Sequence, residues 1–179
     1  MDYLHHSDLR GLNVFEATDY TCTLNFNPAF ANLGKQENRL AVIPIVKIRE
    51  KYGDDAAADY IQLLSSLSRR VIWDYGVDVS LVHHTAGKDE AIITGMASQI
   101  DADVSIVKLD PLATRRYIGE SQLVVSSRFH GVMNALTQNV PVISLGWSHK
   151  YSEIMKLYGA QDYSILELTM PKCRSSLTH

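Results

Sequence analysis

From residue 39 onward, runs of apolar residues bounded by turn signals alternate with amphipathic stretches. This alternation is typical of repeated strand–helix units built around a parallel sheet. We therefore expect an α/β fold in which helices flank a Rossmann-like parallel sheet. The apolar runs that predict its strands are residues 40–46, 77–82, 104–109, 123–126 and 140–145.

Helices are expected between these strands, because apolar residues recur there every three or four positions. The longest helix is predicted at 54–75, and its apolar face is formed by Ile61, Leu64, Leu67, Val71 and Tyr75. The next, at 88–100, places Ile92, Met96 and Ile100 on one face. Further helices are predicted to begin at Pro111 and near Phe129 and to run over 152–158, where Gly159 ends the last one.

The two ends of the chain are less regular than its middle. Residues 1–38 lack a clean period, and Asn27-Pro28 indicates a turn or a linker. Residues 171–179 are expected to form an irregular tail. The pattern therefore predicts one Rossmann-like domain at 39–170.

Composition narrows the range of partners. A chain of 179 residues, of which 46% are apolar and 21% charged, can bury one sizeable core. The net charge of -3 and a pI near 6.1 supply no positive field, so nucleic acid is not an expected partner. The longest apolar run, at 40–46, is far too short to span a bilayer, so no membrane span is expected.

Cysteine and histidine usage gives no sign of a metal site. Cys22 and Cys173 are the only cysteines, and no histidine cluster has the spacing of metal ligands. Two separate cysteines are typical of reduced thiols in the cytoplasm, which is the expected location.

The strand predicted at 123–126 leads directly into Ser127-Arg128-Phe129-His130-Gly131, where the next helix begins. Ligands of open parallel sheets bind at the carboxyl ends of strands, and the free N–H groups of a helix's first turn attract anions. Arg128 can hold a carboxylate or phosphate through two parallel hydrogen bonds, and Gly131 permits close approach of the backbone. The pattern favours an anionic ligand, although spacing alone leaves a capping or surface role open for Arg128 and His130.

The run from Leu123 to Lys150 resembles the signature region of the polysaccharide pyruvyl transferase family. In that region a strand leads into Arg-x-His-Gly, a helix ends before Val-Pro-Val-Ile, and a lysine follows the next strand. The matching positions here are 128–131, 140–143 and Lys150.

Two upstream segments also match, and the whole resemblance spans about residues 25–168. Leu81-Val82-His83-His84, followed by Asp89, is similar to a family segment in which a strand ends at a histidine and an aspartate comes after a short loop. His83 stands where the family usually has proline. Asn27-Pro28-Ala29-Phe30 resembles the family's Pro-Ala-Phe element, which closes the amino-terminal lobe.

The resemblance implies the carboxy-terminal lobe of a two-lobed, glycosyltransferase-B-like fold. The first lobe of such proteins opens with a Gly-rich turn of the Asn-x-Gly-Asp type, and no such turn occurs in this sequence. We therefore expect a truncated chain in which residues 1–38 are the remnant of the amino-terminal lobe and its linker. A partner chain or a second copy would then complete the cleft.

The chemistry that the resemblance implies is transfer of a pyruvyl group from phosphoenolpyruvate to a sugar of a polysaccharide or cell-surface glycan. The products are a pyruvate ketal and phosphate, the acceptor is a glycan or a lipid-linked sugar, and no cofactor is required. His130 is expected to be the general acid, because histidine exchanges a proton near neutral pH, and Arg128 is expected to hold the anion. The expected substrate-binding residues are His84, Ser127, Gly131 and Lys150.

Two other functions fit the same residues. One is the nucleotide-sugar-binding lobe of a glycosyltransferase or an epimerase, with Arg128 on a diphosphate. The other is a non-catalytic, truncated domain that binds an anion and turns nothing over. Within the site, individual residues also have simpler alternatives. Ser127 could cap the helix and Lys150 could be a solvated surface residue. His83 is expected only to pack at the end of its strand.

Overall fold

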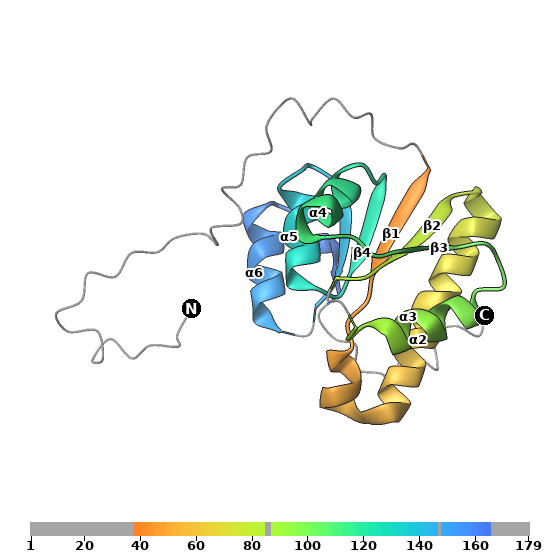
Figure 1. The fold of residues 1–179 in the computed structure, drawn as a ribbon. Helices are drawn as coiled ribbons and strands as arrows, with labels where there is room; N and C mark the ends of the chain where they lie inside the picture. Colours follow the sequence, from red (N-terminus) through yellow and green to blue (C-terminus); the bar gives the residue numbers. More distant parts are fainter. Residues whose placement is uncertain (1–37, 85–86, 147, 166–179) are drawn as a thin grey trace.

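The computed structural model of this chain describes residues 38–84, 87–146 and 148–165. Within them, six parallel strands form one sheet in the order β3-β2-β1-β4-β5-β6, and helices cover both of its faces (Figure 1). This order is that of the doubly wound Rossmann fold. The structure confirms the predicted α/β class with a Rossmann-like parallel sheet.

The elements of the described residues alternate along the chain. The strands are β1 (Arg39–Ile43), β2 (Asp78–Val82), β3 (Ser105–Val107), β4 (Leu123–Ser126), β5 (Val142–Leu145) and β6 (Ser164–Ile165). The α-helices are α2 (Lys47–Tyr75), α3 (Glu90–Gln99), α4 (Pro111–Gly119), α5 (Phe129–Leu136) and α6 (His149–Leu157). These elements lie inside the expected domain at 39–170, whereas residues 1–37 and 166–179 lie outside the described part of the chain.

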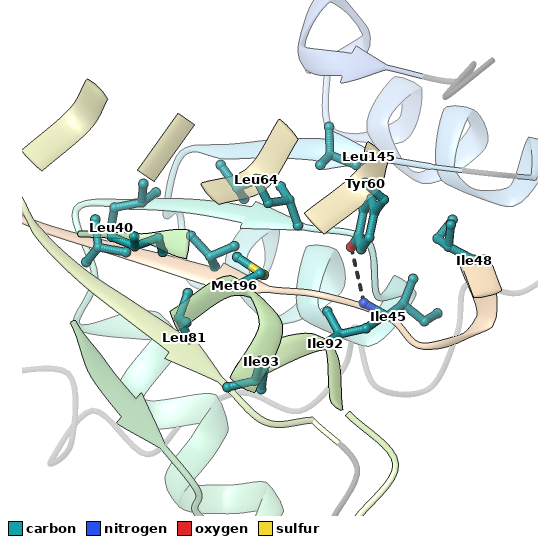
Figure 2. Packing of buried hydrophobic residues seen from close by; sticks show 14 residues of the cluster. Leu40, Ile45, Ile48, Tyr60, Leu64, Leu81, Ile92, Ile93, Met96 and Leu145 are labelled. Atoms are coloured by element: carbon teal, nitrogen blue, oxygen red, sulfur yellow. Dashed lines mark hydrogen bonds between the residues drawn. The ribbon is translucent and has the colours of Figure 1, made fainter. Parts of the chain in front are cut away.

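Two hydrophobic layers hold the sheet between its helices. On one face, Leu40 of β1 packs in a cluster with Tyr60 of α2 and Met96 of α3 (Figure 2). On the other face, Ala41 of β1 packs in a cluster with Val132 of α5 and with residues of α6. Successive side chains of a strand point to opposite faces, so a central strand covered on both sides must be apolar almost throughout. All five residues of β1 are buried.

The first strand ends earlier than predicted. The prediction ran to residue 46, but β1 stops at Ile43 because Pro44 has no N–H group to offer the neighbouring strand. The next backbone N–H, of Ile45, donates to the Tyr60 hydroxyl at 3.2 Å (Figure 2). Strand β5 begins at Val142 rather than at residue 140, because Pro141 likewise has no N–H group to offer a neighbouring strand.

Helix α2 begins before the predicted segment 54–75. It starts at Lys47 and is kinked at Gly53, whose φ of 88° and ψ of -179° are not helical, so the predicted segment is its second part. The predicted apolar face was wrong at Tyr75, which is 74% exposed. The buried positions of this helix include two serines, and Ser68 satisfies its hydroxyl by donating to the Leu64 carbonyl at 2.8 Å.

The other helices lie close to their predicted positions. Ile92, Met96 and Ile100 are all buried, as their spacing predicted. Pro111 is the first residue of α4, and the Asp110 side chain caps that helix by accepting hydrogen bonds from two backbone N–H groups. The two-residue strand β6 was not predicted, because so short a strand carries no readable alternation.

Candidate active site

The sheet reverses its winding between its two central strands, β1 and β4. These strands are parallel neighbours, with Ile43 opposite Ser126. The chain leaves β1 toward α2, on one face, and leaves β4 toward α5, on the other. Such a switch point opens a crevice at the carboxyl ends of the two strands, where ligands of this fold bind. The segment that holds Arg128 and His130 begins at this point.

Arg128 is the N-cap residue of α5, and its extended backbone (φ -101°, ψ 127°) turns the chain from the strand into the helix. Its backbone N–H donates to the Ser126 hydroxyl at 3.1 Å. In the side chain, Nε donates to the Pro44 carbonyl at 3.4 Å and Nη2 pairs with the Asp89 carboxylate. The guanidinium group therefore lies across the switch point, from the end of β4 to the end of β1.

Asp89 was singled out in the sequence only as the aspartate that follows a strand-ending histidine, and the structure shows its partner. It occupies the N-cap position of α3 but makes no side-chain cap. Its side chain is fully buried, whereas that of Arg128 is 15% exposed. A buried carboxylate requires a nearby cation and hydrogen bonds, and Arg128 provides both. The position of Asp89 after a strand-ending histidine was the only signal of this role in the sequence.

His84 and His130 come together at the same edge. His84 follows the end of β2, and His130 lies in the first turn of α5. Their rings are stacked, with centroids 6.1 Å apart and planes inclined by 14°. Burial lowers the pKa of His84 from its ordinary value of 6.5, and the charges of Arg128 and His130 lower it further, against an opposing effect of Asp89. His84 is therefore a neutral imidazole at pH 7.

Lys150 extends this row of side chains to the end of β5. It is exposed in the first turn of α6, and its Nζ lies 4.6 Å from the ring centroid of Phe129. Phe129 in turn meets His130 edge-on, with the ring centroids 5.8 Å apart. The cation is held by the face of the aromatic ring in a cation–π contact. Lys150 and His130 thus contact the same phenyl ring.

Ser127 lies beneath this row rather than in it, and its contact with substrate stays a prediction. Its side chain is buried, and its hydroxyl accepts a hydrogen bond of 2.7 Å from the Tyr60 hydroxyl. Its carbonyl accepts a hydrogen bond of 2.8 Å from the hydroxyl of Tyr151 in α6. The alternative role as a side-chain cap is also absent, because no side chain caps α5. Sequence patterns did not reveal either tyrosine, because each bond joins distant parts of the chain.

Gly131 is buried and faces the sheet, so its small size serves packing. A Cβ atom at this position would overlap Ser126 Oγ and would lie 3.0 Å from Ile43 Cδ1. The glycine lets α5 sit directly on the ends of β1 and β4, as the last glycine of a dinucleotide-binding turn does. This differs from the expected approach of the backbone to a ligand. The close packing at Gly131 brings the first turn of α5, with its unbonded N–H groups, to the crevice.

Among the described residues, no group of three histidine, cysteine, aspartate or glutamate side chains is placed to hold a metal ion. No helix in the described ranges is long and apolar enough to cross a membrane. His83 is buried beside the site with Nε2 3.9 Å from a Glu90 carboxylate oxygen, which fits its predicted place at a strand end.

The domain is an α/β domain whose parallel sheet has the Rossmann strand order. An arginine, two histidines and a lysine lie along one carboxyl edge of the sheet, which suits an anionic ligand. The sequence profile of the polysaccharide pyruvyl transferase family matches residues 2–149, which is most of the chain. The chain belongs to this family. A search of curated proteins found no significant match.

Proposed function

We propose that the protein transfers the pyruvyl group of phosphoenolpyruvate to two hydroxyls of one sugar in a polysaccharide or cell-surface glycan. Membership of the family supports pyruvyl transfer as the general reaction. The donor, the acceptor and the roles of individual residues belong to the proposal. The observation that carries it is the stacked pair His84 and His130, which lies beside the anion-binding Arg128 at the switch point.

His130 is the proposed general acid. Its exposed ring can donate a proton to the methylene carbon of phosphoenolpyruvate, which makes the adjacent carbon electrophilic. One sugar hydroxyl adds to that carbon, the carbon–oxygen bond to phosphate breaks, and the second hydroxyl adds to complete the ketal. Of the two protons that the hydroxyls release, one restores His130 and the other leaves with phosphate. The reaction therefore needs no oxidant and no further reactant.

The anionic groups of the donor are held by charge and by backbone N–H groups. Arg128 presents its guanidinium at the crevice, and the uncapped first turn of α5 lies beside it. Lys150 offers a flexible point charge from the end of β5. Phosphoenolpyruvate carries both a phosphate and a carboxylate, so the N–H groups of Arg128 and the ammonium group of Lys150 can each bind one of its two charged ends.

His84 is proposed to contact the phosphate or a sugar hydroxyl. A neutral imidazole has one N–H donor and one nitrogen acceptor, so it can hydrogen-bond either group without adding charge. Its lowered pKa makes His84 a poor proton donor at neutral pH. This arrangement assigns the acid role to the more exposed ring.

We assign the donor site to a Rossmann-like domain at 39–170, and the acceptor to a surface completed by another lobe, a partner chain or a second copy. The site uses no cofactor, because proton transfer and charge stabilisation account for each step. The reaction is placed in the cytoplasm.

Thermal unfolding of the chain with ligands tests this proposal first. Phosphoenolpyruvate should raise the unfolding temperature, nucleotide-diphosphate sugars should not, and Arg128→Ala should abolish the effect. Stabilisation by the nucleotide sugar alone would show instead a nucleotide-sugar-binding lobe.

Phosphate release in the presence of a sugar acceptor tests turnover. We expect release by the native chain, its loss in His130→Gln, and its retention in His149→Gln, which alters an exposed histidine of α6. Binding of phosphoenolpyruvate without any release would identify a non-catalytic domain.

A further inference from the structure

We propose that Asp89 is a positioning residue for this reaction, which orients the Arg128 guanidinium and cancels its charge before the anionic donor arrives. The inference rests on the proposed function, because it names what prepares Arg128 for the donor. Asp89 itself is fully buried and does not reach the surface of the crevice.

The geometry fixes Arg128 from three sides. Its backbone N–H is held by Ser126 of β4, its Nε by the Pro44 carbonyl after β1, and its Nη2 by Asp89 at the start of α3. The Pro44 carbonyl is part of the backbone and cannot rotate away. Asp89 is therefore the side chain that decides in which plane the guanidinium lies.

The same contacts restrict how Arg128 can bind a ligand. A guanidinium has five N–H groups, and the Pro44 and Asp89 contacts use two of them, which leaves three. These three N–H groups are on Nη1 and Nη2, so a carboxylate or phosphate would bind at that end of the group. A pinned guanidinium loses little freedom when the donor binds.

The charge balance gives the proposal a distinctive signature. The buried pair is close to neutral, so it attracts an anion through directed N–H groups more than through net charge. Replacing Asp89 by the isosteric asparagine removes the negative charge and loosens the guanidinium. Anion affinity should then stay constant or increase, while turnover falls because the donor is no longer held in the reactive orientation.

The experiment compares Asp89→Asn with Glu90→Gln in the full chain. Glu90 is the neighbouring, exposed acid, and its carboxylate lies 3.5 Å from Lys108 Nζ and 3.9 Å from His83 Nε2 but makes no contact with Arg128. We expect Asp89→Asn to bind phosphoenolpyruvate and inorganic phosphate at least as tightly as the native chain, with kcat lower by about 10- to 100-fold. Glu90→Gln should match the native chain in both. An unchanged kcat in Asp89→Asn, or equal losses in affinity and kcat, would overturn the proposal.

A second variant covers the case in which Asp89→Asn does not fold, as judged by loss of a cooperative thermal transition. Asp89→Glu keeps the charge and displaces the carboxylate by one methylene group. It should retain the native affinity for inorganic phosphate and lose turnover. Native turnover in Asp89→Glu would show that the exact placement of the carboxylate is irrelevant.

A measurement on the native chain separates this inference from the proposed function. The Nε–H resonance of Arg128 should exchange slowly with solvent, and binding of inorganic phosphate should leave its exchange rate unchanged. Rapid exchange would show that the guanidinium is not pinned, whatever the chain catalyses. Slow exchange without any turnover of phosphoenolpyruvate would support a fixed Arg128 guanidinium and would contradict the proposed pyruvyl transfer.

Discussion

The imidazole rings of His84 and His130 lie nearly parallel, with 14° between their planes, at the ends of two strands that are separated in the sheet by β1. A proton on one ring disfavours a proton on the other, because the two charges would face each other across a short gap. His84 is the more buried ring and also faces Arg128. The arrangement therefore disfavours a proton on His84.

Acid should destabilise the protein partly through His84. Its pKa is lower in the folded state than its ordinary 6.5, so both states are neutral well above pH 6.5. As the pH falls, the unfolded chain takes up the proton first, and stability is lost. Urea unfolding between pH 7.5 and 5.5 should show a smaller loss in His84→Gln than in the native chain. An identical loss in both would contradict this expectation, and His149→Gln is the control.

Removal of the Tyr60 hydroxyl should destabilise the fold. Tyr60 donates to the Ser127 hydroxyl and accepts from the Ile45 N–H, and burial raises its pKa so that the hydroxyl stays protonated. Tyr60→Phe leaves that buried N–H without its acceptor, at a cost of about 1–3 kcal/mol. Tyr75→Phe, at an exposed position, should have little effect in the same denaturation experiment. Equal stabilities of the two variants would refute the structural role of this hydroxyl.

Gly131→Ala should destabilise the protein by about 1–3 kcal/mol, because the added methyl group overlaps Ser126 and crowds Ile43. The matched control is Gly95→Ala, within α3. There the nearest atom to an added Cβ is the end of the flexible Ile61 side chain, at 3.2 Å, and alanine favours the helix. Gly95→Ala should be neutral or stabilising. Chemical denaturation of both variants tests whether α5 needs its close approach to the sheet.

Lys150→Gln should weaken binding of phosphoenolpyruvate about tenfold, or ~1.4 kcal/mol, through loss of its point charge at the end of β5. Lys156→Gln removes an exposed lysine from the last turn of the same helix and should bind normally. Calorimetric titration of both variants distinguishes a local contact from a general effect of net charge. Equal affinities would place Lys150 outside the site.

Local patterns predicted the sheet, and the grouping of side chains at its carboxyl edge, well. Strand β4 has the predicted bounds, because its apolar run ends where Ser127 and Arg128 begin. The carboxyl ends of parallel strands share one edge, so the sequence also indicated that His84, His130 and Lys150 would lie along it. Side-chain periodicity and fold topology are enough for both inferences.

Contacts between distant side chains were beyond the reach of such patterns. Asp89 and Arg128 are 39 residues apart in the sequence, and only the assembled sheet brings them together. Tyr60 belongs to a helix whose buried face also includes serines, so its role under Ser127 left no trace in the hydrophobic pattern. Local propensities describe elements, whereas the partners of buried polar groups depend on how the elements pack.

Ser127 accepts hydrogen bonds from Tyr60 on one side of the sheet and from Tyr151 on the other. The turn that bears Arg128 and His130 is therefore tied to both helical layers at once. Neither layer can separate from the sheet without breaking a buried bond to this turn. Amide hydrogen exchange of Ser127, whose backbone N–H donates to the Ile43 carbonyl at 3.0 Å, should accordingly follow global unfolding, so that this turn is among the last parts of the molecule to lose its shape.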